Sequence, residues 1–303
     1  MEYVLKTESL KKRYGNHDVL KGLSMNVPKG SIYGFIGKNG AGKTTAIRII
    51  CGLQEPSGGE YSIYGIKNSR RDILTSRRRM GSVIEAPAVY QDMTATDNVK
   101  MQFSILGLPS FKNTEKLLKI VGLENTGRKK VRNFSLGMRQ RLGIAVALAG
   151  SPDFLVLDEP MNGLDPEGII EMRELILDLN RRHNITVLIS SHILDELAKI
   201  ATHFGFIDDG AIVKEISAAK LSDTFRKCVR LEVSDINALS TALADAGMEY
   251  SVISDSTADV FSSVSLTKLT MILSKAGCEI LSAREHDETL ESYYIDLIGG
   301  KGK

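Results

Sequence analysis

The chain has 303 residues, of which 43% are hydrophobic, and its formal net charge at pH 7 is +2. That hydrophobic fraction is enough for a sizeable core. The sequence has no strongly basic stripe of the kind that would suggest binding to nucleic acid. Its three cysteines, Cys51, Cys228 and Cys278, are far apart, which argues against a disulfide framework or a zinc site and for a reducing compartment. Because there is no signal-peptide pattern and no run of roughly 18 apolar residues, any membrane role is expected to come through a partner.

Strands are predicted in the N-terminal part of the chain. Alternating apolar positions indicate strands over residues 2–8 and 19–27, separated by the turn-like stretch Tyr14–Asp18. A third strand, Ser31–Ile36, is a short apolar run that breaks at a glycine and enters a helix near Lys43. A strand, a glycine-rich loop and a helix in succession are the context that a phosphate-binding loop requires.

Helices and buried strands alternate through the middle of the chain. Residues 95–150 carry apolar side chains at helical spacing, and Thr94 is placed to cap the first of these helices. Phe154–Leu157 and Ile185–Ser190 are largely apolar runs, as expected of strands that are buried on both faces. This alternation predicts an α/β fold with a parallel sheet.

The pattern changes near residue 220, and we expect a domain boundary there. Residues 1–218 form the first predicted domain, with a helical subdomain at about 86–150, and residues 219–303 form a small α+β domain. The tail, residues 289–300, is predicted to be a short amphipathic helix. The other strands and helices predicted in the second domain are strands near 228–233, 251–254 and 260–263, and helices near 235–247 and 265–276.

The most specific motif is a loop in which two glycines, separated by four residues, are followed by Lys and Thr. Its glycines let backbone N–H groups converge on a phosphate without Cβ clashes, and the following helix adds the positive end of its dipole. Lys43 is expected to reach the β- and γ-phosphates, and Thr44 to offer its hydroxyl to Mg²⁺. The residues predicted to bind ATP in this loop are Gly37, Lys38, Asn39, Gly40, Ala41, Gly42, Lys43, Thr44 and Thr45.

A pair of adjacent carboxylates, Asp158 and Glu159, follows the apolar run Phe154–Leu157. Ligands bind at the carboxyl ends of the strands in sheets of this kind, so both side chains are expected at the nucleotide site. Asp158 is predicted to bind Mg²⁺ through its water shell, and Glu159 to take a proton from the attacking water. An Asp-Glu pair on its own is usually only the start of a solvated loop, but here the phosphate loop precedes it.

These motifs indicate a P-loop nucleotidase, and a third stretch narrows the class. Phe134–Leu142, with the sequence FSLGMRQRL, lies shortly before the carboxylate pair. Here the chain resembles the ATP-binding cassette (ABC) family, whose LSGGQ signature stands at this distance ahead of the strand that ends in the carboxylates. The resemblance covers residues 1–218. It implies a P-loop core, with a RecA-like parallel sheet, antiparallel strands and a helical subdomain.

The resemblance also implies a head-to-tail dimer, in which each ATP lies between the phosphate loop of one subunit and the signature helix of the other. Ser135 and Gly137 are expected to contact the γ-phosphate, although Ser135 is also a good N-cap. Tyr14 stands where the family stacks adenine. Asp165 stands in the family's D-loop, although Asp followed by Pro is a good helix start in any protein. His192 is predicted to be catalytic, as a donor to the γ-phosphate that keeps the attacking water in line.

The chain departs from the family pattern at two places. The signature has Phe134 and Leu136 where Leu and Gly are usual, but it keeps Ser135 and Gly137. Where the family has a Gln, after the strand that leads to the helical subdomain, this chain has Glu85. We predict that Glu85 contacts Mg²⁺ and mainly tunes coupling, with a solvated loop carboxylate as the alternative. A Glu here resembles the branch that exports peptide antibiotics, which includes bacitracin-resistance and lantibiotic-immunity ATPases.

The expected function is therefore hydrolysis of ATP with Mg²⁺, by a dimer of nucleotide-binding subunits that drives export through a separate integral-membrane permease. The chain is expected in the cytoplasm, peripheral on the inner face of the cell membrane, with no nucleic-acid partner. The leading substrate class is a peptide antibiotic, and another small molecule is the alternative. A non-transport cassette of translation or DNA repair is disfavoured by the single phosphate loop and the lack of sustained heptads. The choice between homodimer and heterodimer stays open.

Overall fold

The chain divides into two compact units, Met1–Ala218 and Ala219–Lys303. Each unit has a hydrophobic core of its own, and each is described by itself below. The structure is a computed structural model, and the residues that it describes are 2–224, 227–261, 265–287 and 289–299.

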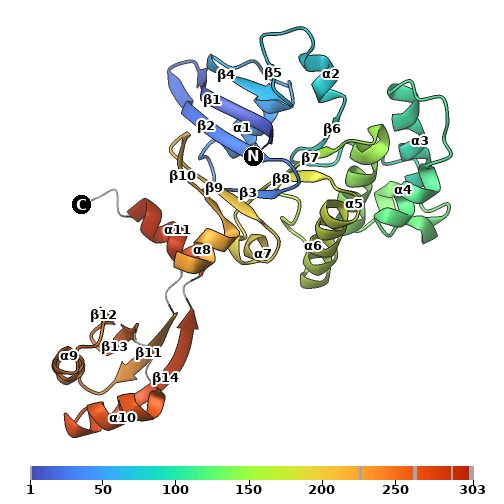
Figure 1. Ribbon diagram of the computed structural model, residues 1–303. Helices are drawn as coiled ribbons and strands as arrows, with labels where there is room; N and C mark the ends of the chain where they lie inside the picture. The colour runs from blue at the N-terminus through green and yellow to red at the C-terminus, as the bar shows by residue number, and fades with distance from the viewer. Residues whose placement is uncertain (1, 225–226, 262–264, 288, 300–303) are drawn as a thin grey trace. The chain divides into compact units, whose positions relative to one another are not determined.

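The centre of the first unit is a six-stranded sheet (Figure 1). Its strands are β3 (Ile32–Ile36), β6 (Met80–Val83), β7 (Phe154–Asp158), β8 (Thr186–Ser191), β9 (His203–Asp208) and β10 (Ala211–Ser217). Their order across the sheet is β10-β9-β3-β8-β7-β6, and all neighbours are parallel except β9 and β10. Every residue of β3, β7 and β8 is buried, which explains their apolar sequences.

A second, antiparallel sheet in this unit has the order β2-β1-β4-β5. Its first two strands are longer than the sequence predicted, because a tight turn at Gly15, with φ of 55°, pairs Tyr14 with His17. Near that turn the two strands are mostly polar and exposed or half-buried, so they carry no alternating apolar signal. The strand bounds are β1 Tyr3–Tyr14, β2 His17–Pro28, β4 Gly58–Ile63 and β5 Ile66–Lys67.

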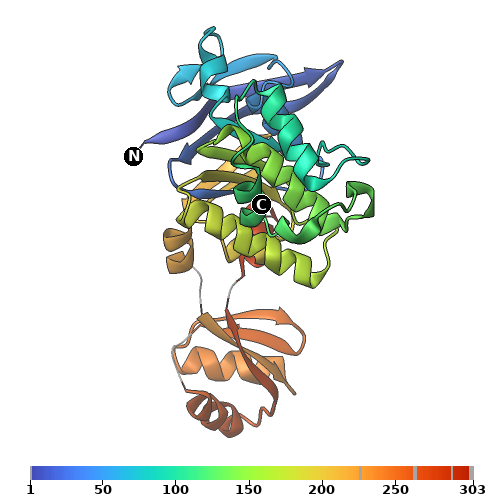
Figure 2. The same ribbon diagram turned by 90° about the vertical axis from the view of Figure 1, so that its right-hand side faces the viewer.

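Helices surround the central sheet, and three of them, α3, α4 and α5, form the green group in Figure 2. The α-helices of this unit are α1 (Lys43–Ile50), α2 (Ile73–Arg77), α3 (Ala95–Ile105), α4 (Thr114–Ile120), α5 (Leu136–Ala147), α6 (Pro166–Arg181) and α7 (Leu194–Ala198). Three short 3₁₀ turns are η1 (Glu124–Thr126), η2 (Val131–Asn133) and η3 (Leu148–Gly150). Thr94 caps α3 as predicted. The predicted α/β fold, with a parallel sheet and antiparallel strands, is confirmed.

The second unit contains a four-stranded antiparallel sheet in the order β12-β13-β11-β14. Leu239 of α9 and Leu269 of α10 belong to its core, together with Leu231 and Ala258 of the sheet. The chain order βαββαβ with this strand order is the split βαβ arrangement. The ends of the predicted strand 260–263 and of the predicted tail helix 289–300 lie outside the described residues. The element bounds are α8 Ala218–Thr224, β11 Lys227–Val233, α9 Ile236–Asp245, β12 Tyr250–Ser254, β13 Thr257–Val260, α10 Leu266–Lys275, β14 Ile280–Asp287 and α11 Leu290–Gly299.

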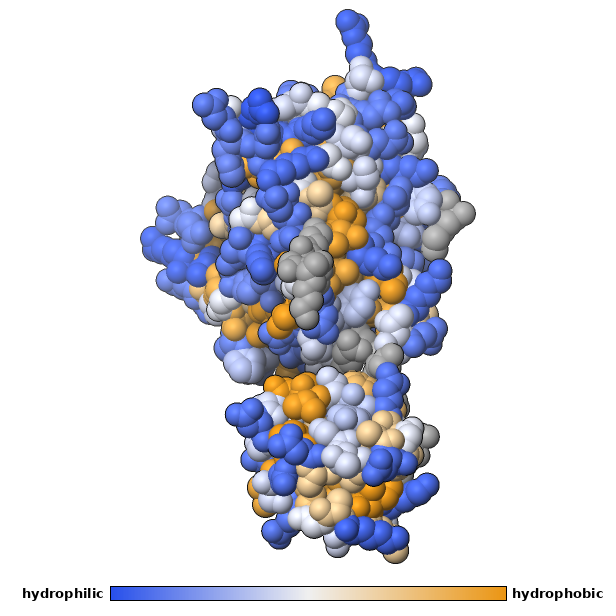
Figure 3. Space-filling model, turned by 90° about the vertical axis from the view of Figure 1, so that its left-hand side faces the viewer, coloured by the Kyte–Doolittle hydropathy of each residue, from blue (hydrophilic) through white to orange (hydrophobic). Residues whose placement is uncertain are grey.

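In the view of Figure 3 the surface is mostly hydrophilic, and hydrophobic patches are visible on the larger unit and on the smaller unit. Exposed apolar side chains of that unit include Val252, Ile253, Leu266 and Met271. Across the described part of the chain, no helix combines the length and the hydropathy needed to cross a bilayer.

Candidate active site

The glycine-rich loop joins the end of β3 to the start of α1 and lines a cavity of about 380 Å³. Gly42, at the N-cap of α1, has a φ of 107°, which favours glycine, and no described side chain caps this helix. The first N–H groups of a helix have no partner within it, so the start of α1 is suited to bind an anion. The residues that line the cavity are Val19, Lys38, Asn39, Gly40, Gly42, Lys43, Thr44, Thr45, Glu159, Asn162 and His192.

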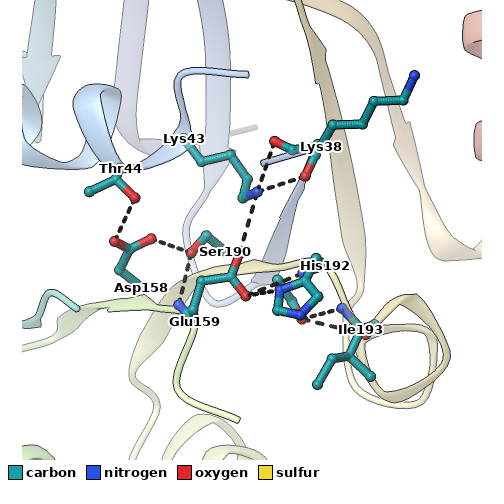
Figure 4. A network of polar contacts seen from close by, with 10 residues as sticks. Lys38, Lys43, Thr44, Asp158, Glu159, Ser190, His192 and Ile193 are labelled. Carbon is teal, nitrogen blue, oxygen red and sulfur yellow. Dashed lines mark hydrogen bonds and ion pairs between the residues drawn. The ribbon is translucent and has the colours of Figure 1, made fainter. Parts of the chain in front are cut away.

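Lys43 is buried at the centre of this loop, with only 6% of its side chain exposed. Its Nζ donates to the carbonyl oxygens of Gly37 and Lys38, at 2.6 and 3.3 Å, and lies 3.4 Å from Oε1 of Glu159 (Figure 4). A buried ammonium can balance the charge of a phosphate bound on the loop.

Two oxygen-bearing side chains, Thr44 and Asp158, meet beside the loop. Asp158 ends β7 and is buried; its Oδ2 accepts from Oγ1 of Thr44 at 2.9 Å, and its Oδ1 accepts from Oγ of Ser190 at 2.5 Å (Figure 4). Hydroxyl and carboxylate oxygens are suitable Mg²⁺ ligands. Among the described residues, no three or more His, Cys, Asp or Glu side chains form a group that could hold a metal ion.

Glu159 and His192 face each other at the ends of neighbouring strands. Because β7 and β8 pair in parallel, with Asp158 opposite Ser190, the residues that follow them emerge at the same edge of the sheet. Oε2 of Glu159 lies 2.7 Å from Nδ1 of His192, and the backbone N–H of Glu159 donates to Oγ of Ser190 at 2.9 Å. The Glu159 carboxylate is thus fixed in the cavity wall, where it can accept a proton.

The signature and D-loop residues lie outside the residues that line this cavity. Ser135 caps α5 and Asp165 caps α6, each by accepting a backbone N–H. The two segments lie close together, since a Cβ on Gly137 would be 3.7 Å from Cδ2 of Leu164. The structure therefore does not bring Ser135, Gly137 or Asp165 to the phosphate loop of their own chain.

Tyr14 and Glu85 also lie outside the cavity lining. Tyr14 is 44% exposed, its hydroxyl donates to Gln54, and Nζ of Lys12 lies 5.2 Å from its ring centroid. An exposed ring of this kind is free to stack on a base. The Glu85 carboxylate pairs with Arg48 at 2.5 Å, so its predicted contact with Mg²⁺ would require the side chain to move.

Three residues at the site were not predicted from the sequence. Ser190 is fully buried and contacts both Asp158 and Glu159. A polar residue at the end of an otherwise apolar strand is a feature of the sequence that could have indicated its place at the site. Asn162 lies between Glu159 and the D-loop and could have been included for its position. Val19 lies on β2, and nothing in its sequence context indicates a contact with the cavity.

A phosphate loop at a helix start, a buried lysine within it and two carboxylates at the end of β7, another strand of the same sheet, define a P-loop ATPase. The family model described as ABC transporter matches residues 20–162. The bacitracin transport ATP-binding protein BcrA of Bacillus licheniformis is 41% identical over 99% of both chains. The chain belongs to the ABC transporter family.

Two further comparisons agree with this assignment. The lantibiotic transport ATP-binding protein SrtF of Streptococcus pyogenes is 46% identical over 70% of this chain and 90% of its own. The dimeric cassette MJ0796, solved in a post-hydrolysis state with ADP and phosphate, matches with a TM-score of 0.62 and 26% identity, over 71% of this chain and 98% of that one. The expected ATP-binding and ATPase character is confirmed. ABC ATP-binding subunits dimerise and work with a membrane permease.

Proposed function

We propose that Glu159 is the general base of MgATP hydrolysis in this chain. The observation that carries the proposal is its placement in the cavity wall, with Lys43 at 3.4 Å from one carboxylate oxygen and His192 at 2.7 Å from the other. From there it can accept the proton of a water that attacks a γ-phosphate on the loop, while His192 keeps the carboxylate in place. Mg²⁺, held by Thr44 and Asp158, would neutralise charge on the phosphate oxygens.

A second nucleotide-binding subunit would complete each site. Ser135 and Gly137 lie at the start of α5, where free N–H groups and the helix dipole suit a phosphate. In a head-to-tail dimer they would meet the ATP bound to the partner, with Asp165 beside the interface and Tyr14 stacked on adenine. The dimeric state of the similar cassette MJ0796 supports this arrangement.

The dimer would drive a separate integral-membrane permease, on which the chain would lie at the cytoplasmic face of the cell membrane. We propose a peptide antibiotic of the bacitracin type as the exported substrate. The likeness to the bacitracin transport protein extends over 99% of the chain and so includes the second unit, whereas that to the lantibiotic transport protein extends over 212 residues. The full-length likeness therefore favours bacitracin over a lantibiotic.

Export is tested by expressing the chain, together with the proposed permease subunit, in a bacitracin-sensitive bacterium. The inhibitory concentration of bacitracin should rise several-fold, and the rise should disappear in Glu159→Gln. Protection against a lantibiotic but not against bacitracin would contradict the assignment of bacitracin and indicate a lantibiotic as the substrate. Protection against neither, with ATPase activity intact, would exclude the peptide class and leave another small molecule as cargo.

A further inference from the structure

Glu85 is presented at the same edge of the sheet as the catalytic carboxylates. β6 pairs in parallel with β7 and places Val83 opposite Leu157, so Glu85 and Glu159 each stand two residues beyond the last paired positions. Both glutamates have a positive φ, 58° and 51° respectively. Residues other than glycine adopt this conformation at a cost, so the surrounding structure holds each backbone in place.

The Glu85 carboxylate forms an ion pair with Arg48 of α1. Nη2 of Arg48 lies 2.5 Å from Oε1 of Glu85, with the two side chains 35% and 59% exposed. Arg48 follows Thr44 by four residues in α1, so both side chains project from the same face of the helix, one turn apart. The carboxylate is therefore bound one helical turn from the Thr44 hydroxyl.

We propose that Arg48 is a positioning residue that competes with Mg²⁺ for the Glu85 carboxylate. The inference rests on the proposed function, in which Mg²⁺ is held by Thr44 and Asp158. While Glu85 is paired with Arg48, its negative charge is neutralised and kept away from the triphosphate. Exposed ion pairs are weak, and a carboxylate is a good ligand for a divalent cation, so the pair can open when the metal is present.

The chain beyond Glu85 connects this competition to the signature helix. Pro87 packs directly on α5, because a Cβ on Gly143 would lie 2.7 Å from Cβ of Pro87. Ser135, proposed to meet the partner's ATP, caps the start of the same helix. The short segment from Glu85 to Pro87 thus contacts the phosphate-loop helix α1 at one end and the signature helix α5 at the other. A change in the partner of Glu85, from Arg48 to Mg²⁺, would therefore act on a segment that contacts both helices.

The test is a Mg²⁺ titration of nucleotide binding that requires no turnover. Full-length protein carrying Glu159→Gln is titrated with MgCl₂ in the presence of a fluorescent ATP analogue. Arg48→Gln should lower the half-saturating Mg²⁺ concentration by about three- to fivefold, because it removes a competing exposed ion pair. Arg48→Lys keeps the charge and should stay close to the parent. In a Glu85→Gln background, Arg48→Gln should cause no shift, because no carboxylate is left to compete for.

An equal shift with Glu85 present and with Glu85→Gln would overturn the proposal, since Arg48 would then act on the nucleotide directly. The matched control is Arg70→Gln, which removes another exposed ion pair, that of Arg70 with Asp72. If Arg48→Gln shifted the half-saturating Mg²⁺ concentration no more than Arg70→Gln does, the proposal would also be overturned. Saturable nucleotide binding by the parent reports separately on the proposed function. If the parent binds nucleotide and Arg48→Gln has no effect, only the inference about Arg48 fails.

Discussion

At the scale of single residues, Glu159 is the proposed general base, and Lys43 and His192 contact its carboxylate. Glu159→Gln keeps the shape of the side chain but cannot accept a proton. We therefore expect ATP binding to persist and hydrolysis to fall by about 10²- to 10⁴-fold. Phosphate release measures the rate, and size-exclusion chromatography with ATP should show a stable dimer. Turnover at the parental rate would remove Glu159 from the role of general base.

Lys43 should affect binding rather than only the chemical step. Lys43→Ala removes a buried ammonium from the centre of the loop, and charge-assisted hydrogen bonds of this kind correspond to about 10- to 100-fold in affinity. Isothermal titration with ATP measures the change. Lys29→Ala, which breaks only an exposed ion pair with Glu2, is the control. Unchanged ATP affinity in Lys43→Ala would contradict the assignment of the phosphate loop.

At the scale of secondary-structure elements, α3 and α4 differ in how they begin. Thr94 accepts from the backbone of Asp97 in a capping box, whereas Asn113, at the N-cap of α4, makes no side-chain capping bond among the described residues. Thr94→Ala should therefore destabilise the protein by about 1 kcal/mol, and Asn113→Ala by less than about 0.5 kcal/mol. Urea unfolding followed by circular dichroism compares the two. Equal losses would mean that the cap of α3 contributes nothing specific.

The same cap gives a pH-dependent prediction. The Thr94 hydroxyl donates to Oδ2 of Asp97 at 2.7 Å, which lowers the pKa of that carboxyl from its ordinary value. A carboxyl whose pKa is lower in the folded state stabilises the fold above its unfolded pKa, and the effect is lost as pH falls through the folded pKa. The stability difference between the parent and Asp97→Asn should be full at about pH 6 and disappear toward about pH 3. Urea midpoints across this range provide the measurement; a difference independent of pH would exclude an ionised Asp97 as its source.

At the scale of the whole molecule, nucleotide binding should depend on the first unit. No residue of the second unit lines the 380 Å³ cavity among those described, and residues 219–303 carry nine Lys and Arg against thirteen Asp and Glu. A chain that ends at Ala218 should bind ATP with the parental affinity, provided that circular dichroism shows it to be folded. Loss of binding by a folded truncated chain would make the second unit part of the site or of the dimer.

The elements that were predicted well have local causes. The Thr94 cap, the buried runs of β3 and β7 and the helix after the glycine loop each follow from residues within a few positions of one another. The hairpin of β1 and β2 was predicted too short, because its outer ends are held by cross-strand pairing. Arg13 and Asp18, for example, form an exposed ion pair at 2.6 Å that leaves no periodic pattern in the sequence.

The sequence by itself determined that this protein is a P-loop ATPase with an ABC signature, because the glycine loop, the carboxylate pair and the signature are short patterns with specific chemistry. Only the tertiary structure decided the partners of those residues. Ser190 reaches Asp158 because β8 lies next to β7, and Glu85 meets Arg48 because β6 ends near α1. The split βαβ topology of the second unit was decided in the same way. Strand order and register join residues that are far apart along the chain, and no local pattern specifies them.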